Sequence, residues 1–218
     1  MMHIIRFNKF NSAVTALIIL GMTQGCKAIG NGTLIVESNP PDLNYLPVFI
    51  PFLLGGHATA VPISESVSLT AAHVAKYDYS SVIAYHPDCD VALIKSNNKN
   101  KHILEIGLVH SGESVTNYGF EFTGNIVRGE GKYVMDVTAD GYPNCNYSLN
   151  DAPQKSGMSG GAVLNESGQL VGIMHGIGTN IPVLHDSNEK VILDRYSYFV
   201  PIRFIEDWIK HHLPDPVK

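Results

Sequence analysis

A short glycine-rich turn around Ser159 constrains this chain more than any other feature. Residues 155–163 read KSGMSGGAV, with a serine between glycines directly before an apolar run. Glycine lets a backbone turn sharply and approach its neighbours closely. A serine hydroxyl is a weak nucleophile at neutral pH, so it reacts only beside a base and beside backbone donors that hold an oxyanion. The stretch thus predicts a nucleophile only if the chain also supplies a histidine and an acid. Otherwise it predicts an ordinary turn before a strand.

The composition favours a loop-rich, mostly β protein. The 218 residues are 44% apolar and 16% charged, which is typical of a globular chain. The 20 glycines and 12 prolines, together with little helical periodicity, favour short strands joined by turns. The formal net charge of -5 argues against nucleic acid as a partner.

Residues 1–25 have the pattern of a signal peptide. A basic start precedes an apolar run over residues 12–22, which is too short to span a bilayer as a stable anchor. Two processing patterns stay open. The residues TQGC are similar to a bacterial lipoprotein box with Cys26 as the lipidated residue, whereas ordinary cleavage would follow Ala28. In either case the polar residues 26–46, rich in turn formers, are expected to form a tether.

The chain has three cysteines, and two of them are expected to pair. If Cys26 is lipidated or removed, Cys89 and Cys145 remain as an even pair in an oxidising compartment. A disulfide between them would stabilise the fold by roughly 3–5 kcal/mol in the chain-entropy estimate. The alternative is two free buried thiols.

A strand that ends in a histidine and a strand that begins with an acid supply the groups that Ser159 needs. Residues 67–70 (VSLT) are expected to form a strand that runs through two alanines to His73. Asp90 comes directly before the apolar residues 91–94, which are expected to form a buried strand. A buried carboxylate needs a partner, and a histidine N–H is a suitable one. Two alternatives stay open: Asp90 is only a turn residue, or the neighbouring Asp88 is the acid.

The turn that carries Asp90 also holds other side chains that can bind metals. They are His86, Asp88 and Cys89. No second cluster in the sequence completes such a site, so neither a metal nor a cofactor is expected.

His73, Asp90 and Ser159 follow one another in an order that resembles the chymotrypsin-like (trypsin-like) serine peptidases. The segments that carry the resemblance are LTAAH, DVALI and GMSGG. The resemblance implies that Ser159 is the nucleophile, His73 the general base and acid, and Asp90 the residue that orients His73. It also implies that the N–H groups of Gly157 and Ser159 form the oxyanion hole.

The same resemblance implies an all-β fold of two six-stranded antiparallel β-barrels with the site in the cleft between them. The peptidase domain would cover residues 47–213. Its N-terminal barrel would span about 47–110 and its C-terminal barrel about 111–200, followed by a helix over 201–213. The residues support this helix, because Ile205, Trp208 and Ile209 share one helical face.

The residue before Ser159 departs from the digestive members of the family. Met158 stands where those enzymes carry an aspartate that pairs with a new N-terminus after zymogen cleavage. The segment Ile29–Gly32, although it resembles a trypsin-type start, is therefore not expected to act as an activation switch.

The resemblance says less about which bond is cut. The candidate pocket residues are Pro153, Gln154, Met174 and His175. Pro153 stands where trypsins have an aspartate at the pocket floor, so a preference for Lys or Arg is not expected. His175 lies one position later than the pocket histidine of glutamate-specific relatives, and Gln154 replaces a threonine often found there. A preference for acidic residues therefore competes with the alternative that His175 lines the cleft without selecting a substrate.

Taken together, the motifs predict an exported serine endopeptidase that cuts polypeptides through a Ser-His-Asp triad and an acyl-enzyme intermediate. The alternative is a peptidase-like lipoprotein that acts as a binding module with little or no turnover. An exported chain would be periplasmic, anchored in the outer membrane by a lipid on Cys26, or secreted.

Overall fold

The computed structural model describes residues 29–48, 56–77, 81–139, 141–178, 183–184 and 193–213. The predicted signal peptide and Cys26 lie outside these residues, so the predictions about export and lipidation stay predictions. No helix in the described ranges is long and apolar enough to cross a membrane.

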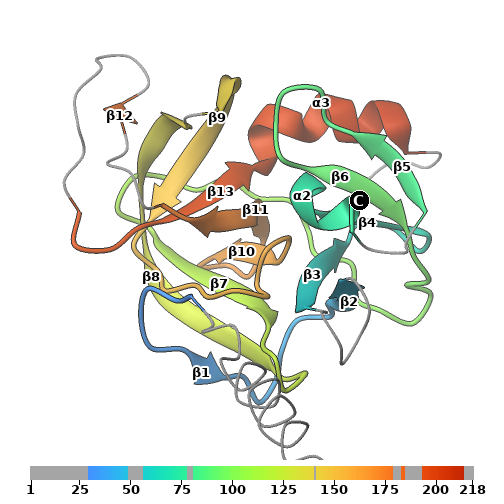
Figure 1. The fold of residues 1–218 in the computed structure, drawn as a ribbon, viewed down its shortest axis with the longest axis horizontal. Helices are drawn as coiled ribbons and strands as arrows, with labels where there is room; N and C mark the ends of the chain where they lie inside the picture. Colours follow the sequence, from blue (N-terminus) through green and yellow to red (C-terminus); the bar gives the residue numbers. More distant parts are fainter. Residues whose placement is uncertain are drawn as a thin grey trace, which may run out of the picture.

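The N-terminal half of the described chain forms a five-stranded antiparallel sheet (Figure 1). Its spatial order is β2–β3–β4–β6–β5, which leaves β2 and β5 at the two ends of the sheet. The strands are β2 (Asn44–Val48), β3 (Gly56–Pro62), β4 (Val67–Thr70), β5 (Val82–Tyr85) and β6 (Ala92–Lys95). A one-turn helix, α2 (Ala72–Ala75), follows β4.

The C-terminal half forms an eight-stranded sheet with the order β1–β8–β7–β10–β11–β13–β9 and with β12 paired to β8. Because the long strand β8 pairs with β9 as well as with β7, the strands from β8 to β9 form a closed ring of pairings. The strands are β1 (Ile35–Val36), β7 (Ser114–Phe120), β8 (Ile126–Ala139), β9 (Tyr142–Asn150), β10 (Ala162–Asn165), β11 (Leu170–Ile177), β12 (Val183–Leu184) and β13 (Ser197–Pro201).

The prediction of an all-β fold with two antiparallel sheets and a C-terminal helix is confirmed. The N-terminal sheet differs from the predicted closed barrel, because no pairing joins β2 to β5 in the described part of the chain. The helix α3 (Ile202–His212) buries Ile202, Ile205 and Ile209 and packs against β11 and β13. Trp208 on the same helix lies against the ring of His86, with 5.0 Å between the ring centroids.

Part of the segment predicted as a tether is built into the sheets. β1 pairs with β8 and β2 pairs with β3. Asn31 accepts a hydrogen bond of 2.7 Å from the N–H of Gln154 and donates one of 2.9 Å to the backbone oxygen of Tyr196. Gln154 and Tyr196 lie more than a hundred residues from Asn31 in the sequence, and the segment's own apolar runs are too short to predict strands.

Candidate active site

Asp90 accepts three hydrogen bonds from the start of helix α2. Its backbone oxygen accepts from the N–H of Ala72 (3.2 Å), and its Oδ1 accepts from the N–H of His73 (2.7 Å). Its Oδ2 accepts a bond of 2.5 Å from Nδ1 of His73. The N–H groups at the start of a helix have no partner within the helix. Asp90 therefore fixes both the helix and the ring of His73.

The Asp90 carboxylate is buried and ionised. Its side chain is 1% exposed. Burial acts to raise its pKa, but the hydrogen bonds from His175 and His73 outweigh burial and hold the pKa well below the usual range of an aspartate. An ionised carboxylate only accepts hydrogen bonds, so Nδ1 carries the proton in both histidines. In the neutral ring, Nε2 of His73 is then free to act as a base.

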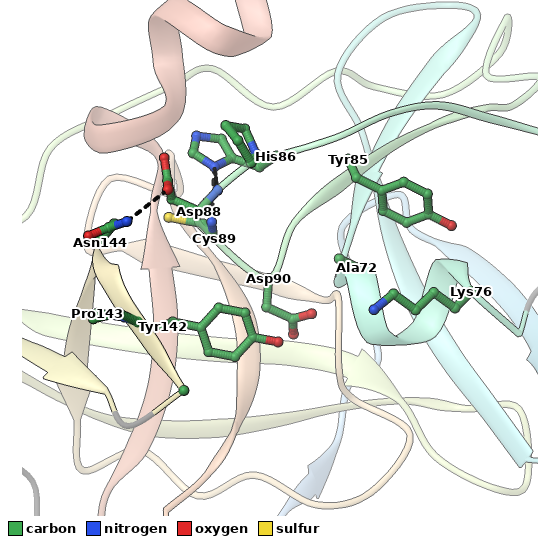
Figure 2. Close-up of a pocket in the computed structure, with 12 residues that line it drawn as sticks. Ala72, Lys76, Tyr85, His86, Asp88, Cys89, Asp90, Tyr142, Pro143 and Asn144 are labelled. Carbon is green, nitrogen blue, oxygen red and sulfur yellow. Dashed lines mark hydrogen bonds between the residues drawn. The ribbon is translucent and has the colours of Figure 1, made fainter.

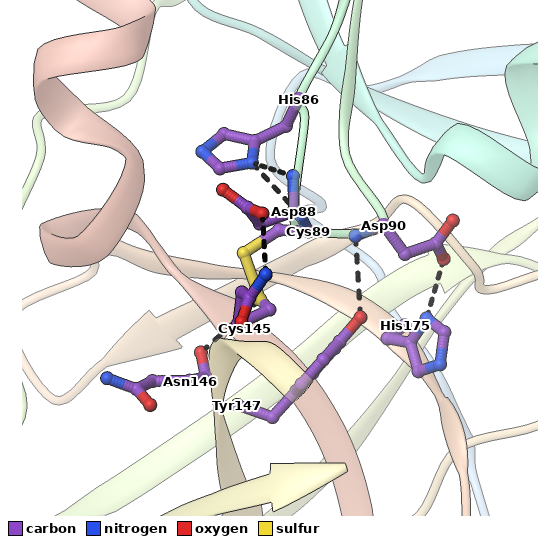
Figure 3. Close-up of a disulfide and its surroundings, with 9 residues drawn as sticks. His86, Asp88, Cys89, Asp90, Cys145, Asn146, Tyr147 and His175 are labelled. Carbon is purple, nitrogen blue, oxygen red and sulfur yellow. Dashed lines mark hydrogen bonds and ion pairs between the residues drawn. A yellow bond between two sulfur atoms is a disulfide. The ribbon is translucent and has the colours of Figure 1, made fainter. Parts of the chain in front are cut away.

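His175 is the second imidazole on this carboxylate. Its Nδ1 donates a bond of 2.6 Å to Oδ2 of Asp90, and its ring meets that of His73 edge to face at 5.7 Å. Figure 3 shows the His175 ring and the Tyr147 hydroxyl approaching Asp90 from the C-terminal sheet. The Tyr147 hydroxyl accepts a bond of 3.4 Å from the N–H of Asp90. The sequence suggested a pocket role for His175 and gave no signal for its contact with Asp90.

A disulfide between Cys89 and Cys145 joins the two halves of the fold beside Asp90 (Figure 3). Cys89 directly precedes Asp90, and Cys145 lies in β9 two residues before Tyr147. The two Cα atoms are 5.1 Å apart. The predicted pairing is confirmed, and it ties the loop that carries Asp90 to the C-terminal sheet.

Ser159 lies in a turn that packs tightly against the N-terminal sheet. Gly160 has a φ of +79°, a left-handed conformation that other residues rarely adopt. A Cβ atom on Gly160 would lie 2.2 Å from both the backbone oxygen of Thr59 and Oγ1 of Thr70. Glycine therefore allows the turn to reach β3 and the end of β4, the strand that leads to His73.

The hydroxyl of Ser159 has a backbone partner, whereas the predicted oxyanion donors have no acceptor among the described residues. Oγ of Ser159 donates a bond of 3.3 Å to the backbone oxygen of His175, and among the described residues no hydrogen bond joins it to His73. The N–H groups of Gly157 (φ +98°) and Ser159 have no acceptor within the described part of the chain. Free N–H groups next to a nucleophile are the donors that an oxyanion hole needs.

Residues 54–173 match the family model of the trypsin-like peptidase domain, and this range is more than half of the chain. The chain belongs to the trypsin-like peptidase family. His73, Asp90 and Ser159 lie within the matched range, and His175 lies just beyond it. A comparison with curated protein sequences gives no significant match.

Solved structures of trypsin-like proteases share this fold at low sequence identity. The HtrA-type protease AlgW with a tripeptide has a TM-score of 0.63 and 18% identity; the match covers 78% of this chain and 59% of that chain. The active form of the Rv3671c protease from M. tuberculosis has a TM-score of 0.64 and 17% identity, with 82% and 84% covered. The MamO protease domain from Magnetospirillum magneticum has a TM-score of 0.60 and 19% identity, with 81% and 97% covered. This chain thus spans less than two thirds of the AlgW chain, and the likeness concerns the fold.

Three of the four candidate pocket residues of this trypsin-like peptidase are buried. Pro153 packs against Gly129, where an added Cβ would lie 2.1 Å from the Pro153 backbone oxygen. Gln154 is 2% exposed, and its Oε1 has no hydrogen-bond partner among the described atoms. Met174 is fully buried beside Gly161. Only His175, at the Asp90 carboxylate, is partly exposed.

A cavity of about 320 Å³ lies beside Asp90 (Figure 2). Its walls come from helix α2, from the turn between β5 and β6, and from the start of β9. Figure 2 shows the hydroxyl of Tyr142 pointing toward the Asp90 carboxylate. Burial and the negative charge of Asp90 raise the pKa of Tyr142. The cavity adjoins Ala72, the neighbour of His73, and none of the four candidate pocket residues lines it.

Proposed function

We propose that this chain is a serine endopeptidase that hydrolyses polypeptides with Ser159 as nucleophile, His73 as general base and acid, and Asp90 as the orienting carboxylate. The observation that carries the proposal is the 2.5 Å bond from Nδ1 of His73 to Oδ2 of Asp90. This bond leaves Nε2 of His73 unprotonated in the neutral ring. The turn that carries Ser159 is held against the N-terminal sheet by a bond of 3.0 Å from the N–H of Thr59 to the backbone oxygen of Ser159. A polypeptide substrate agrees with the peptide bound to AlgW.

Acylation begins when the Ser159 hydroxyl turns from the His175 carbonyl toward Nε2 of His73. Oγ attacks the carbonyl carbon of the scissile peptide bond, and its proton passes to Nε2. The N–H groups of Gly157 and Ser159 hold the oxyanion, and Asp90 stabilises the imidazolium. His73 then gives the proton to the leaving amine nitrogen. The C–N bond breaks, and the acyl group stays on Oγ as an ester.

Deacylation reuses the same groups with water as the nucleophile. His73 takes a proton from the water as its oxygen attacks the ester carbon. The C–O bond to Ser159 breaks, and the proton returns to Oγ. One water molecule is consumed for each peptide bond cut, and no cofactor takes part in these steps.

A fluorophosphonate probe tests the nucleophile directly, because it reacts with an activated serine hydroxyl. We expect the purified protein to be labelled and the adduct to map to Ser159. Ser159→Ala should abolish the label. Ser156→Ala is the matched control, since Ser156 lies exposed in the same turn and its Oγ bonds to Ile29. Equal labelling of native protein and Ser159→Ala contradicts the assignment.

One observation favours a second function, a binding module with little turnover. The Ser159 hydroxyl bonds to a backbone oxygen and not to His73 in the described structure. Cleavage of an unfolded polypeptide such as denatured casein separates the two functions. Cleavage that is lost in His73→Ala supports the peptidase, whereas tight binding of the polypeptide without cleavage supports the binding module.

Export and a lipid anchor on Cys26 belong to the same proposal and rest on the N-terminal sequence pattern. Metabolic labelling with a fatty-acid analogue tests the anchor. Incorporation that Cys26→Ser abolishes supports lipidation, and an unlabelled mature chain that begins at Ile29 supports ordinary cleavage.

A further inference from the structure

The carboxylate of Asp90 serves two histidines that come from opposite halves of the fold. Oδ2 accepts from Nδ1 of His73 at 2.5 Å and from Nδ1 of His175 at 2.6 Å. A carboxylate oxygen has lone pairs for both bonds. His73 belongs to the helix beside the N-terminal sheet, and His175 belongs to β11 of the C-terminal sheet. Asp90 is thus shared across the candidate site.

A β-bulge turns the His175 side chain toward Asp90. In the pairing of β11 with β13, Met174 faces Phe199 and Gly176 faces Tyr198, so the residue between them is left without a partner. Bulges of this kind redirect a side chain and occur often next to active sites. Two tyrosine rings contact the His175 ring. The distance between ring centroids is 5.0 Å for Tyr147 and 5.7 Å for Tyr142.

The groups that face the two histidines keep a constant charge near neutral pH. Asp90 stays ionised because its pKa is held well below the usual range. Burial and the nearby carboxylate raise the pKa values of Tyr142 and Tyr147, so both hydroxyls stay neutral. Lys76, which directly follows helix α2, lines the cavity next to Asp90.

The same cavity carries two titratable groups from the turn before β6. His86 accepts the N–H groups of Asp88 and Cys89 at Nδ1, and burial lowers its pKa. Asp88 accepts a bond from Asn144 on β9. Neither of them bonds to His73 or His175 in the described structure, so neither competes with Asp90 for these two rings.

We propose that His175 is a positioning residue that shares Asp90 with His73 and holds the Asp90 carboxylate in place for it. The inference rests on the proposed function of His73 as the base. Oδ1 of Asp90 accepts from the backbone N–H of His73, and Oδ2 accepts from both imidazole rings. The N–H of His175 therefore fixes the direction of the carboxylate that orients His73.

A donor-free variant tests the positioning role through the second-order rate constant of fluorophosphonate labelling at neutral pH. His175→Leu removes the N–H and should lower this rate constant at least 10-fold. His175→Asn, whose amide still offers an N–H to Asp90, should stay within about 3-fold of native protein. Equal rate constants in the two variants contradict the positioning role.

Proton NMR gives a readout that does not depend on turnover. In Ser159→Ala at low temperature, two strongly downfield imidazole N–H signals should be present, and His175→Asn in this background should remove one of them. A single signal in Ser159→Ala overturns the shared carboxylate. Two signals together with a native protein that no fluorophosphonate labels would instead contradict the proposed function, so the two failures are distinguishable.

Discussion

The backbone N–H of Thr59 donates a hydrogen bond of 3.0 Å to the backbone oxygen of Ser159. Thr59 is fully buried, and its Oγ1 also donates to the backbone oxygen of Gly157 (3.1 Å) and accepts from the N–H of Phe120 (2.9 Å). One residue of β3 therefore holds the turn of the candidate nucleophile at two points and the end of β7 at a third. The two halves of the fold meet through this residue.

Thr59→Val should weaken both the fold and the site. Valine keeps the shape of threonine but leaves the N–H of Phe120 without its acceptor, so we expect the free energy of unfolding to fall by about 1–3 kcal/mol. Urea denaturation measures this change, and the rate of fluorophosphonate labelling should fall with it. Thr59→Ser keeps the hydroxyl and should recover most of the labelling rate. Full labelling of Thr59→Val would show that the hydroxyl does not support the turn.

Gly160→Ala should be far more damaging than alanine at a glycine of similar conformation. Gly160 and Gly112 have φ values of +79° and +81°, so the backbone strain is comparable. Only Gly160 also lacks space, since its Cβ would meet Thr59 and Thr70, whereas nothing lies within 4 Å of a Cβ on Gly112. We expect a loss of about 1 kcal/mol in Gly112→Ala and at least about 3 kcal/mol in Gly160→Ala. Similar unfolding midpoints of the two variants would contradict the close approach.

Asp90→Asn should destabilise the protein in a pH-dependent way. The folded-state pKa of Asp90 lies below the ordinary value of 3.8, so its stabilising contribution is complete above that value and is lost as the pH falls through the folded-state pKa. The melting temperatures of native protein and Asp90→Asn should differ most at pH 7 and should converge in acid. The loss at pH 7 is expected to be roughly 3 kcal/mol, from the hydrogen bonds to a charged acceptor.

Asp88→Asn is the control for this experiment, because Asp88 is the neighbouring carboxylate and its side chain accepts a hydrogen bond only from Asn144 among the described residues. Its melting temperature should follow that of native protein at every pH. A constant difference between native protein and Asp90→Asn from pH 7 into acid would mean that ionisation of Asp90 does not stabilise the fold. An activity loss in Asp88→Asn as large as that in Asp90→Asn would assign the acid to Asp88.

Removal of the disulfide should lower stability and disturb Asp90. The double variant Cys89→Ser, Cys145→Ser opens a loop closed over 56 positions, which corresponds to about 4 kcal/mol in the chain-entropy estimate. Because Cys89 precedes Asp90, the rate of fluorophosphonate labelling should also fall at temperatures where the variant is still folded. Native protein treated with a reductant should behave like the variant. An unchanged labelling rate in both would show that β9 places Asp90 without the covalent bond.

Much of the fold could be predicted, because the strong local patterns coincide with the elements. The strand expected over residues 67–70 is β4, and the helix expected over residues 201–213 is α3, which spans Ile202–His212. The disulfide pairing also followed from counting cysteines. The order of His73, Asp90 and Ser159 at strand boundaries was sufficient to indicate the family, since each segment is short and carries its own signature.

The rest depends on contacts between distant segments, which local patterns do not encode. His175 reaches Asp90 because of a bulge in β11, and strand alternation alone predicts no such rotation. The polar sequence NNKNK over residues 97–101 is typical of an exposed loop, yet Asn98 is 1% exposed and its Nδ2 donates to the backbone oxygens of Ser64 and Val67. The local sequence does not show that Asn98 is buried, because the acceptors that satisfy its amide lie more than 30 residues earlier in the chain.

The disulfide between Cys89 and Cys145 can form only after β9 has been synthesised, so it bears on when the candidate site can form. A chain made from its N-terminus presents His73 and Asp90 early, but the cysteine, tyrosine and histidine that hold Asp90 all come from the second half. A nascent chain that ends before β9 therefore has Asp90 without the groups that hold it, and His73 without Ser159. The proposed site can be complete only after the second half of the chain has been made.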